Sequence, residues 1–233
     1  MLRRIIKKLP GIRFVQGGWP DEARAIIQTP LFHQVLKGHN VGGNCLNAGC
    51  GEGLFVPFLN SFPGLTRIVH MDVHEPSLPH LPDARHKIIE GSITNLPFED
   101  DEFDFVFCTE VLEHVVDDAE ALREISRVLR LDGLALISTP TLTAPFDPAH
   151  VREGYTLNEI RAAFASVHFE LLEHCFCLHA AMRLLVRIWR WQYELTGEQQ
   201  SWMPRAIILA LAYTDRWLPF GKPFDIVALG RKA

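Results

Sequence analysis

From residue 41 onward, short apolar runs alternate with segments whose apolar positions recur at helical spacing. Helical patterns cover residues 52–62, 118–130 and 156–164. Strands that alternate with helices indicate a parallel sheet covered by helices on both faces. The runs that fit buried strands are 44–47, 67–72, 86–90, 103–109, 134–139, 168–176 and 225–229.

Local signals set several boundaries of these elements. Thr156 is followed three positions later by Glu159, which predicts a capping box at the start of a helix. Asp132 and Gly133 predict the end of the preceding helix. Three prolines between residues 74 and 83 argue against a full helix there.

The length of 233 residues suits one sizeable domain rather than two independent ones. We expect residues 1–40 to form a helical lead-in and 41–177 to form a ligand-binding core. Residues 178–222 are expected to form a helical insertion or lid, and 223–233 the final strand.

The composition is that of a globular protein, with 48% hydrophobic and 22% charged residues, which argues against disorder. The cysteines are odd in number and form no C-x-x-C pair, so we expect reduced thiols rather than disulfides or a cysteine zinc site. No signal peptide is visible, and the late apolar run at 206–213 is too short to span a bilayer. The sequence therefore predicts a cytoplasmic protein, with peripheral contact to the inner face of a membrane as the alternative.

Charge is unevenly distributed along the chain, whose net charge is −5. Residues 1–40 carry 7 Lys or Arg against 2 Asp or Glu, and residues 180–233 carry 8 against 4. The middle, 41–179, carries 8 against 22. The two basic ends are either solvated helix faces or surfaces that meet something anionic.

Glycines stand at alternate positions after the first strand, in Ala48-Gly49-Cys50-Gly51-Glu52-Gly53. Glycine lets a backbone turn tightly and approach a ligand, because it has no Cβ. The spacing differs from the G-x-G-x-x-G of dinucleotide-binding proteins. The next strand ends at Asp72, whose carboxylate can accept hydrogen bonds from both hydroxyls of a ribose. Taken singly, an ordinary turn and a capping Asp remain open alternatives.

Together with later motifs, the glycine turn and Asp72 resemble class I S-adenosylmethionine-dependent methyltransferases, in particular the small-molecule, ubiquinone-biosynthesis-like branch. The resemblance runs from about residue 41 to 175. It implies S-adenosylmethionine as the cofactor. It also implies a Rossmann-like, mostly parallel seven-stranded sheet with helices on both faces and an antiparallel last strand. The later motifs are Gly91-Ser92-Ile93, Leu96-Pro97-Phe98, Phe103-Asp104-Phe105-Val106 and Glu110-Val111-Leu112-Glu113-His114-Val115.

The resemblance further implies which residues contact the cofactor. The glycine turn would pass under the methionine part, Asp72 would hold the ribose, and Ser92 and Ile93 would border the adenine. Ser92 and Asn47 stand where the family often has an acid, and they keep hydrogen bonding without its charge. The implied contacts are Ala48, Gly49, Cys50, Gly51, Gly53, Asp72, Val73, Ser92, Ile93, Cys108 and Thr109.

Polar residues that could carry the chemistry follow the fourth and fifth strands. Glu110, Glu113 and His114 have the spacing of one face of a helical turn, and His150 lies in the next loop at the same sheet edge. Such a set can bind magnesium or zinc, and it is similar to the metal site of small-RNA 2′-O-methyltransferases. The open alternative is that His114 or His150 acts as a metal-free base or shapes the acceptor pocket.

Basic and apolar residues also alternate near both ends of the chain. Arg183, Arg187 and Arg190 share a helical face within 180–195, and residues 2–9 repeat the pattern. Basic amphipathic helices with tryptophan can lie in a membrane interface. The alternative is a lid over the acceptor pocket.

Three classes of function fit these observations. The first is an S-adenosylmethionine-dependent methyltransferase that acts on a small or lipid-linked acceptor, at oxygen. The second is an RNA 2′-O-methyltransferase, although the acidic middle of the chain argues against a nucleic-acid partner. The third is a non-catalytic module that binds the cofactor. The sequence does not predict an oligomeric state.

Overall fold

The computed structural model describes residues 19–74, 76, 78, 81, 83–197 and 203–233. Its contacts divide the chain into two compact units. The helical unit comprises the described residues through Gln28 together with Leu178–Lys222. The sheet unit comprises Thr29–Cys177 together with Pro223–Ala233. The division falls after Gln28, after Cys177 and after Lys222. The basic pattern at 2–9 lies outside the described residues.

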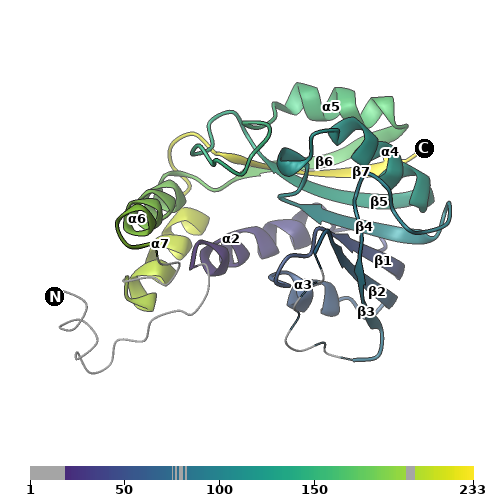
Figure 1. Ribbon diagram of the computed structural model, residues 1–233, viewed down its shortest axis with the longest axis horizontal. Helices are drawn as coiled ribbons and strands as arrows, with labels where there is room; N and C mark the ends of the chain where they lie inside the picture. Colours follow the sequence, from purple (N-terminus) through teal and green to yellow (C-terminus); the bar gives the residue numbers. More distant parts are fainter. Residues whose placement is uncertain (1–18, 75, 77, 79–80, 82, 198–202) are drawn as a thin grey trace. The chain divides into compact units, whose positions relative to one another are not determined.

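Seven strands form one sheet in the sheet unit, in the order β3-β2-β1-β4-β5-β7-β6 (Figure 1). Strand β7 runs antiparallel to both of its neighbours, and the other adjacent pairs are parallel. This confirms the expected Rossmann-like α/β fold. The strands are β1 (Gly43–Ala48), β2 (Leu65–Asp72), β3 (His86–Glu90), β4 (Phe103–Thr109), β5 (Leu129–Pro140), β6 (Phe169–Cys177) and β7 (Asp225–Lys232).

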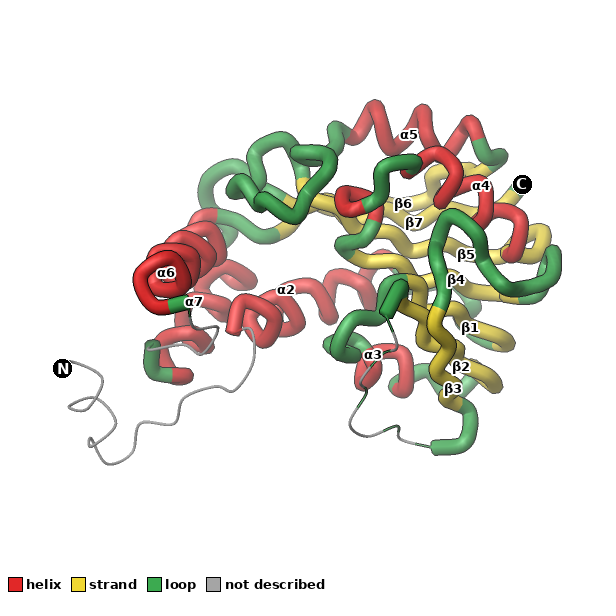
Figure 2. The backbone as a smooth tube through the Cα atoms, viewed as in Figure 1, coloured by secondary structure: helices red, strands yellow, loops and turns green. Residues whose placement is uncertain are grey.

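Helices follow most strands, as Figure 2 shows in red. The first helix, α2, crosses the boundary between the two units. The helices are α2 (Trp19–Val35), α3 (Val56–Asn60), α4 (Asp118–Val128), α5 (Leu157–Ser166), α6 (Ala180–Thr196) and α7 (Arg205–Trp217), with a 3-10 turn at Leu112–His114.

Each face of the sheet has its own core, because successive strand residues point to opposite faces. Leu46 and Val106 belong to a cluster that also contains the buried residues of α4 and α5. On the other face, the ring centroid of Phe107 lies 5.4 Å from that of Phe58 in α3 and 5.3 Å from that of Phe32 in α2. In the described part of the chain the middle strands are thus buried on both sides, which favours a ligand site at an edge of the sheet.

The helix predicted over 52–62 is shorter than expected. Helix α3 begins only at Val56 and has Pro57 in its first turn. The preceding residues form turns instead, with φ angles of 51° at Gly51 and 82° at Gly53 that lie in the region favoured by glycine.

The helix predicted over 118–130 also ends early. Helix α4 stops at Val128, because Leu129 already pairs with Phe103 in the sheet. Asp132 therefore lies inside β5, where its φ of 61° marks a local irregularity rather than the end of a helix.

Two other local predictions are confirmed. The Thr156 hydroxyl accepts a hydrogen bond from the amide of Glu159 at 3.2 Å, and the Glu159 carboxylate accepts one from the amide of Thr156 at 2.8 Å. This is the predicted capping box at the start of α5. Among the described residues between 74 and 83, none is helical.

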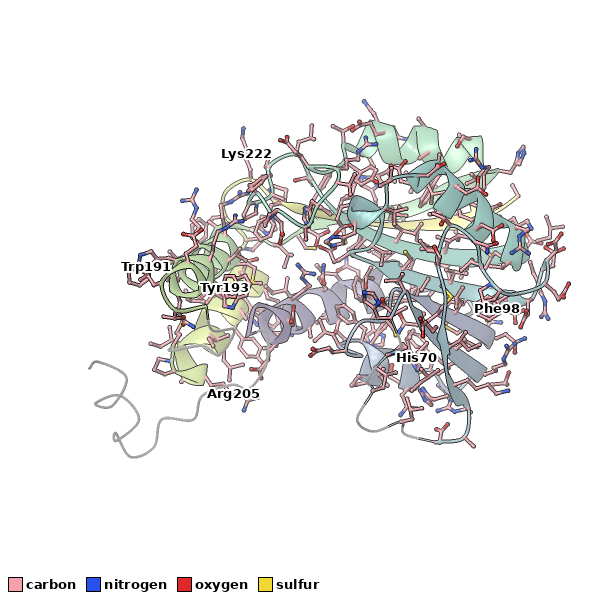
Figure 3. All side chains as sticks on the ribbon, viewed as in Figure 1. His70, Phe98, Trp191, Tyr193, Arg205 and Lys222 are labelled. Carbon is pink, nitrogen blue, oxygen red and sulfur yellow. The ribbon has the colours of Figure 1, made fainter. Side chains whose placement is uncertain are left out.

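Two buried histidines form a hydrogen-bonded chain on the α3 side of the sheet (Figure 3 labels His70). The Nδ2 atom of Asn47 lies 3.0 Å from Nδ1 of His70, and Nε2 of His70 lies 2.9 Å from Nδ1 of His86. Nε2 of His86 in turn lies 3.3 Å from Oδ1 of Asn60. With both imidazoles neutral and protonated at Nε2, every contact joins one donor to one acceptor. The amide of Asn47 is the donor that this arrangement needs.

Burial, together with the neighbouring imidazole, lowers the pKa of His70 from 6.5 to about 4. Burial also lowers the pKa of His86, against the opposing effect of Asp83. A histidine whose pKa is lowered by folding binds a proton more readily in the unfolded chain, so acid favours unfolding.

We therefore expect the free energy of unfolding of the sheet unit to fall as the pH drops from 6.5 towards about 4. The shift of His70 corresponds to a loss on the order of 3 kcal/mol across that window. Urea titrations at a series of pH values measure it. His70→Gln should flatten the dependence, whereas His174→Gln, at an exposed position on β6, should keep it. An unchanged slope in His70→Gln would contradict this account.

Candidate cofactor and acceptor site

A cavity of about 810 Å³ opens at the carboxyl ends of β1, β2 and β4. Its volume is in the range of small-molecule sites, and this edge is where open α/β sheets bind ligands. The lining residues are Gly49, Gly51, Met71, Asp72, Val73, Gly91, Ser92, Ile93, Thr94, Glu110, Val111, His114, Val115, Val116, Asp117 and Glu120.

Six of the predicted cofactor contacts line this cavity: Gly49, Gly51, Asp72, Val73, Ser92 and Ile93. The other five do not line it: Ala48, Cys50, Gly53, Cys108 and Thr109. Ala48 and Cys108 are fully buried in the sheet. Sequence reasoning missed the wall formed by Val115, Val116 and Asp117, whose only signal is that they follow β4 at the same edge.

The glycine turn is anchored to the end of β2. The carbonyl oxygen of Met71 accepts hydrogen bonds from the amides of Gly49 at 2.8 Å and Cys50 at 3.0 Å. Gly49 has a φ of 73°, and a Cβ at this position would lie 2.2 Å from Cγ2 of Val111. Glycine is therefore required at residue 49 both by backbone conformation and by the close approach of the loop after β4.

Asp72 is held by backbone amides next to the cavity. Its Oδ2 accepts a hydrogen bond from the amide of Gly51, and its Oδ1 accepts one from the amide of Val73, each at 2.8 Å. A carboxylate oxygen has two lone pairs, so each oxygen can accept one further hydrogen bond. The side chain thus caps the turn and can still receive a pair of neighbouring hydroxyls.

Glu110 follows β4 in a strained conformation. Its φ of 55° lies in the left-handed region, which non-glycine residues rarely adopt. The hydroxyl of Ser138 donates a hydrogen bond to its Oε1 at 2.7 Å. Strain of this kind costs energy and is concentrated at functional sites, and here it places a carboxylate in the cavity wall.

Three of the four predicted metal ligands come together. Glu113, His114 and His150 each offer an atom within 4.8 Å of the others. Glu110 does not belong to this group. Two backbone hydrogen bonds hold the loop that carries His150 against Glu113. The carbonyl oxygen of Glu113 accepts them from the amides of Val151 at 2.8 Å and Arg152 at 3.2 Å.

The geometry of this group sets the role that each atom can take. Nδ1 of His114 lies 3.0 Å from the carbonyl oxygen of Ala149 and must donate to it, so Nε2 carries the lone pair of the neutral ring. Nε2 lies 4.0 Å from Oε1 of Glu113, whose side chain is only 1% exposed. The ring of His150 stands across that of His114, with centroids 4.8 Å apart.

His114 and His150, whose rings are in contact, line two different cavities. His114 lines the large cavity, and His150 lines a smaller one of about 180 Å³ in the loop after β5. Apolar side chains near them are unusually exposed, with Val116 at 87% and Phe146 at 71%. The surface beside the two histidines is therefore partly apolar.

Comparison with known proteins shows which family this part of the chain resembles. Residues 46–137, which hold the glycine turn, Asp72 and His114, match the family described as "Methyltransferase domain". A protein of Mycolicibacterium smegmatis named "Probable S-adenosylmethionine-dependent methyltransferase" is 30% identical over 161 residues, which are 65% of this chain and 61% of that protein. Residues 46–137 are therefore similar to the methyltransferase domain of S-adenosylmethionine-dependent enzymes. The chain spans less than two thirds of the length of that relative.

Two further comparisons bear on the same region and on the fold. The rice protein "2-methyl-6-phytyl-1,4-hydroquinone methyltransferase 1, chloroplastic" is 32% identical over 138 residues, which are 53% of this chain and 37% of that protein. The solved structure of the "[4+2]-Cyclase SpnF" superposes with a TM-score of 0.63 at 15% identity, covering 99% of this chain and 91% of that one. That structural likeness shows the fold alone.

The two glycines that flank Cys50 should tolerate a methyl group differently. Gly49→Ala would place a Cβ against Val111 in a left-handed conformation, whereas a Cβ at Gly51 would meet no atom within 4 Å. We expect Gly49→Ala to lower the melting temperature of the ligand-free protein clearly more than Gly51→Ala, which bears only backbone strain of about 1 kcal/mol. Thermal unfolding of the two variants tests this, and equal melting temperatures would refute it.

Proposed function

We propose that this protein transfers the methyl group of S-adenosylmethionine to an oxygen atom of a small or lipid-linked acceptor. The observation that carries the proposal is the position of His114 in the wall of the cavity that Gly49 and Asp72 also line. S-adenosylmethionine supplies an activated methyl group on a sulfonium, so the protein needs mainly to position the acceptor and to accept its proton.

The residues at the sheet edge fit this cofactor. Asp72 has two acceptor positions left for the hydroxyls of a ribose, once the amides of Gly51 and Val73 are counted. The glycine turn brings backbone without side chains to the cavity, and Ser92, which follows β3, adds a hydroxyl to the cavity lining. The role of each residue follows from the donors and acceptors that it presents.

His114 is suited to accept the proton of the acceptor hydroxyl. Its Nδ1 is committed to the carbonyl of Ala149, so Nε2 is the basic atom. Transfer of the proton to Nε2 would create an imidazolium, whose charge the carboxylate of Glu113 at 4.0 Å would stabilise. A base of this kind contributes roughly 10²–10⁴-fold to a rate.

The surroundings of the two histidines favour an apolar acceptor. Val116, Leu142, Phe146 and Val151 are large apolar side chains that remain exposed in the loops that carry or adjoin His114 and His150. Polar substrates would gain little from them. The name of the rice relative, a phytyl-hydroquinone methyltransferase, supports an acceptor that joins a hydroquinone ring to a hydrocarbon chain.

A metal-assisted version of the same reaction uses Glu113, His114 and His150. Two imidazoles and one carboxylate are a ligand set of catalytic zinc, and the donors lie within 4.8 Å of one another. Magnesium prefers an all-oxygen site, so zinc fits better. The ion would lower the pKa of the acceptor hydroxyl, and the proton would pass to water because His114 would then be a ligand.

The two other classes of function are less well supported. An RNA substrate requires neutralisation of phosphates, whereas residues 41–179 carry 22 acidic against 8 basic side chains. A non-catalytic module would not need a histidine held with Nε2 beside the cavity.

Replacing His114 with Ala should reduce methyl transfer while leaving affinity for S-adenosylhomocysteine within about twofold, because the base acts on the acceptor rather than on the cofactor. We expect turnover to fall roughly 10²–10⁴-fold. Transfer of labelled methyl from S-adenosylmethionine to an alkyl-substituted hydroquinone measures it. The matched control is His174→Ala, on the exposed part of β6, which should keep full activity.

Chelation separates the two versions of the mechanism. If EDTA abolishes wild-type turnover and zinc restores it, the metal version holds; if EDTA has no effect, His114 acts as the base. Turnover of His114→Ala equal to that of the wild type would overturn both.

A further inference from the structure

The helical unit carries an unusual share of exposed apolar side chains. Nine of the seventeen large apolar side chains that are exposed among the described residues lie between Leu184 and Phe220. Trp217 is 68% exposed and Trp191 is 59% exposed. Contiguous exposed apolar surface marks an interaction site. We therefore look for the kind of partner that this surface fits.

On α6 these residues form one stripe. Leu184, Ile188, Trp191 and Leu195 recur at spacings of four, three and four, which places them on a single helical face. All except the half-buried Ile188 are exposed. Trp191 projects outward from α6 in Figure 3. The α6 stripe is separate from the buried residues of the helix, which are Ala181, Met182, Leu185 and Gln192.

Helix α7 presents a second stripe. Ala206, Ala210, Tyr213 and Trp217 follow the same helical spacing and are all exposed, and the exposed Leu218 and Phe220 extend the stripe beyond the end of the helix. The buried residues of α7 are Ile208, Ala212 and Asp215.

The two helices form one scaffold and lie side by side (Figures 1 and 2). The buried carboxylate of Asp215 accepts hydrogen bonds from the amides of His179 at 2.8 Å and Met182 at 2.9 Å, so α7 caps the first turn of α6. The amide of Ala180 also donates to the carbonyl of Phe220 at 3.0 Å. Both stripes therefore belong to a fixed helix pair.

Basic side chains border both stripes. Arg183, Arg187 and Arg190 form the adjacent face of α6, and the guanidinium of Arg216 lies 5.0 Å from the ring centroid of Trp217. The described residues of the helical unit contain seven Lys or Arg against four Asp or Glu. Of those acids, Asp215 is buried and Glu22 binds Arg205, while Glu194 lies 3.6 Å from Arg190.

We propose that the α6 and α7 stripes bind the surface of an anionic phospholipid bilayer, with the tryptophans and leucines in the interface and the arginines against the headgroups. Tryptophan, leucine and arginine in this arrangement are typical of helices that lie in a membrane interface. Among the described residues, no helix is long and apolar enough to cross a bilayer, so the contact is made in the plane of the surface.

Charge distinguishes this partner from the others that an apolar face could meet. Two copies joined through these stripes would bring their arginine rows together, which costs energy. A nucleic acid would satisfy the arginines but leave Leu184, Leu195 and Leu218 without an apolar partner. An anionic bilayer offers partners to both the arginines and the leucines.

The test is co-sedimentation of the full chain with vesicles of phosphatidylcholine, with and without phosphatidylglycerol. We expect binding to the anionic vesicles that weakens with salt, and little binding to the neutral ones. The double variant Trp191→Ser/Trp217→Ser should lose about tenfold or more in affinity, because two indoles no longer enter the interface. The control Leu131→Ser, at an equally exposed position on β5, should bind as the wild type does.

A charge variant, Arg187→Gln, should weaken binding to anionic vesicles only. Circular dichroism checks that each variant is folded. Two results would overturn the proposal directly: no binding of the wild type to anionic vesicles, or equal binding of the double variant. The proposal would also fail if the wild type did not bind vesicles but self-associated, and the double variant no longer self-associated. None of these outcomes depends on whether the protein transfers methyl groups.

Discussion

The carbonyl oxygen of Met71 fixes the geometry of the cofactor cavity. It accepts hydrogen bonds from the amides of Gly49 and Cys50, because parallel pairing places the ends of β1 and β2 side by side. The chain must then turn over the end of β2, where the amide of Gly51 meets the carboxylate of Asp72. The same turn leaves no room for a Cβ beside Val111, so the loop after β4 closes the cavity on its other side. The cavity follows from backbone contacts that any change of strand register would break.

The sequence could predict these features because each depends on neighbouring residues or on strand order. Glycines at 49 and 51, Asp72 at a strand end, and the capping box of Thr156 and Glu159 are local signals with one dominant physical explanation each. Parallel strands also place their carboxyl ends at one edge, so the convergence of Asp72 and His114 followed from the order of elements.

Other features depend on contacts between distant parts of the chain, and no local pattern reveals them. The separation of Glu110 from Glu113 arises from the left-handed backbone at Glu110 and from its hydrogen bond to Ser138. The position of His150 arises from two hydrogen bonds to the carbonyl of Glu113. Likewise, α4 ends at Val128 because the sheet extends to Leu129, although the helical pattern continues beyond it.

Calorimetric titration with S-adenosylhomocysteine tests the central claim, that the cavity beside Asp72 binds this cofactor, most directly. The account predicts micromolar or tighter binding to the wild type and a Kd about 100-fold higher or more for Asp72→Ala, since two hydrogen bonds to a charged group contribute about 1.5–3 kcal/mol each. Glu173→Ala, an exposed carboxylate on β6, should bind as the wild type does. An absence of binding to the wild type, or equal affinity in Asp72→Ala, would contradict it.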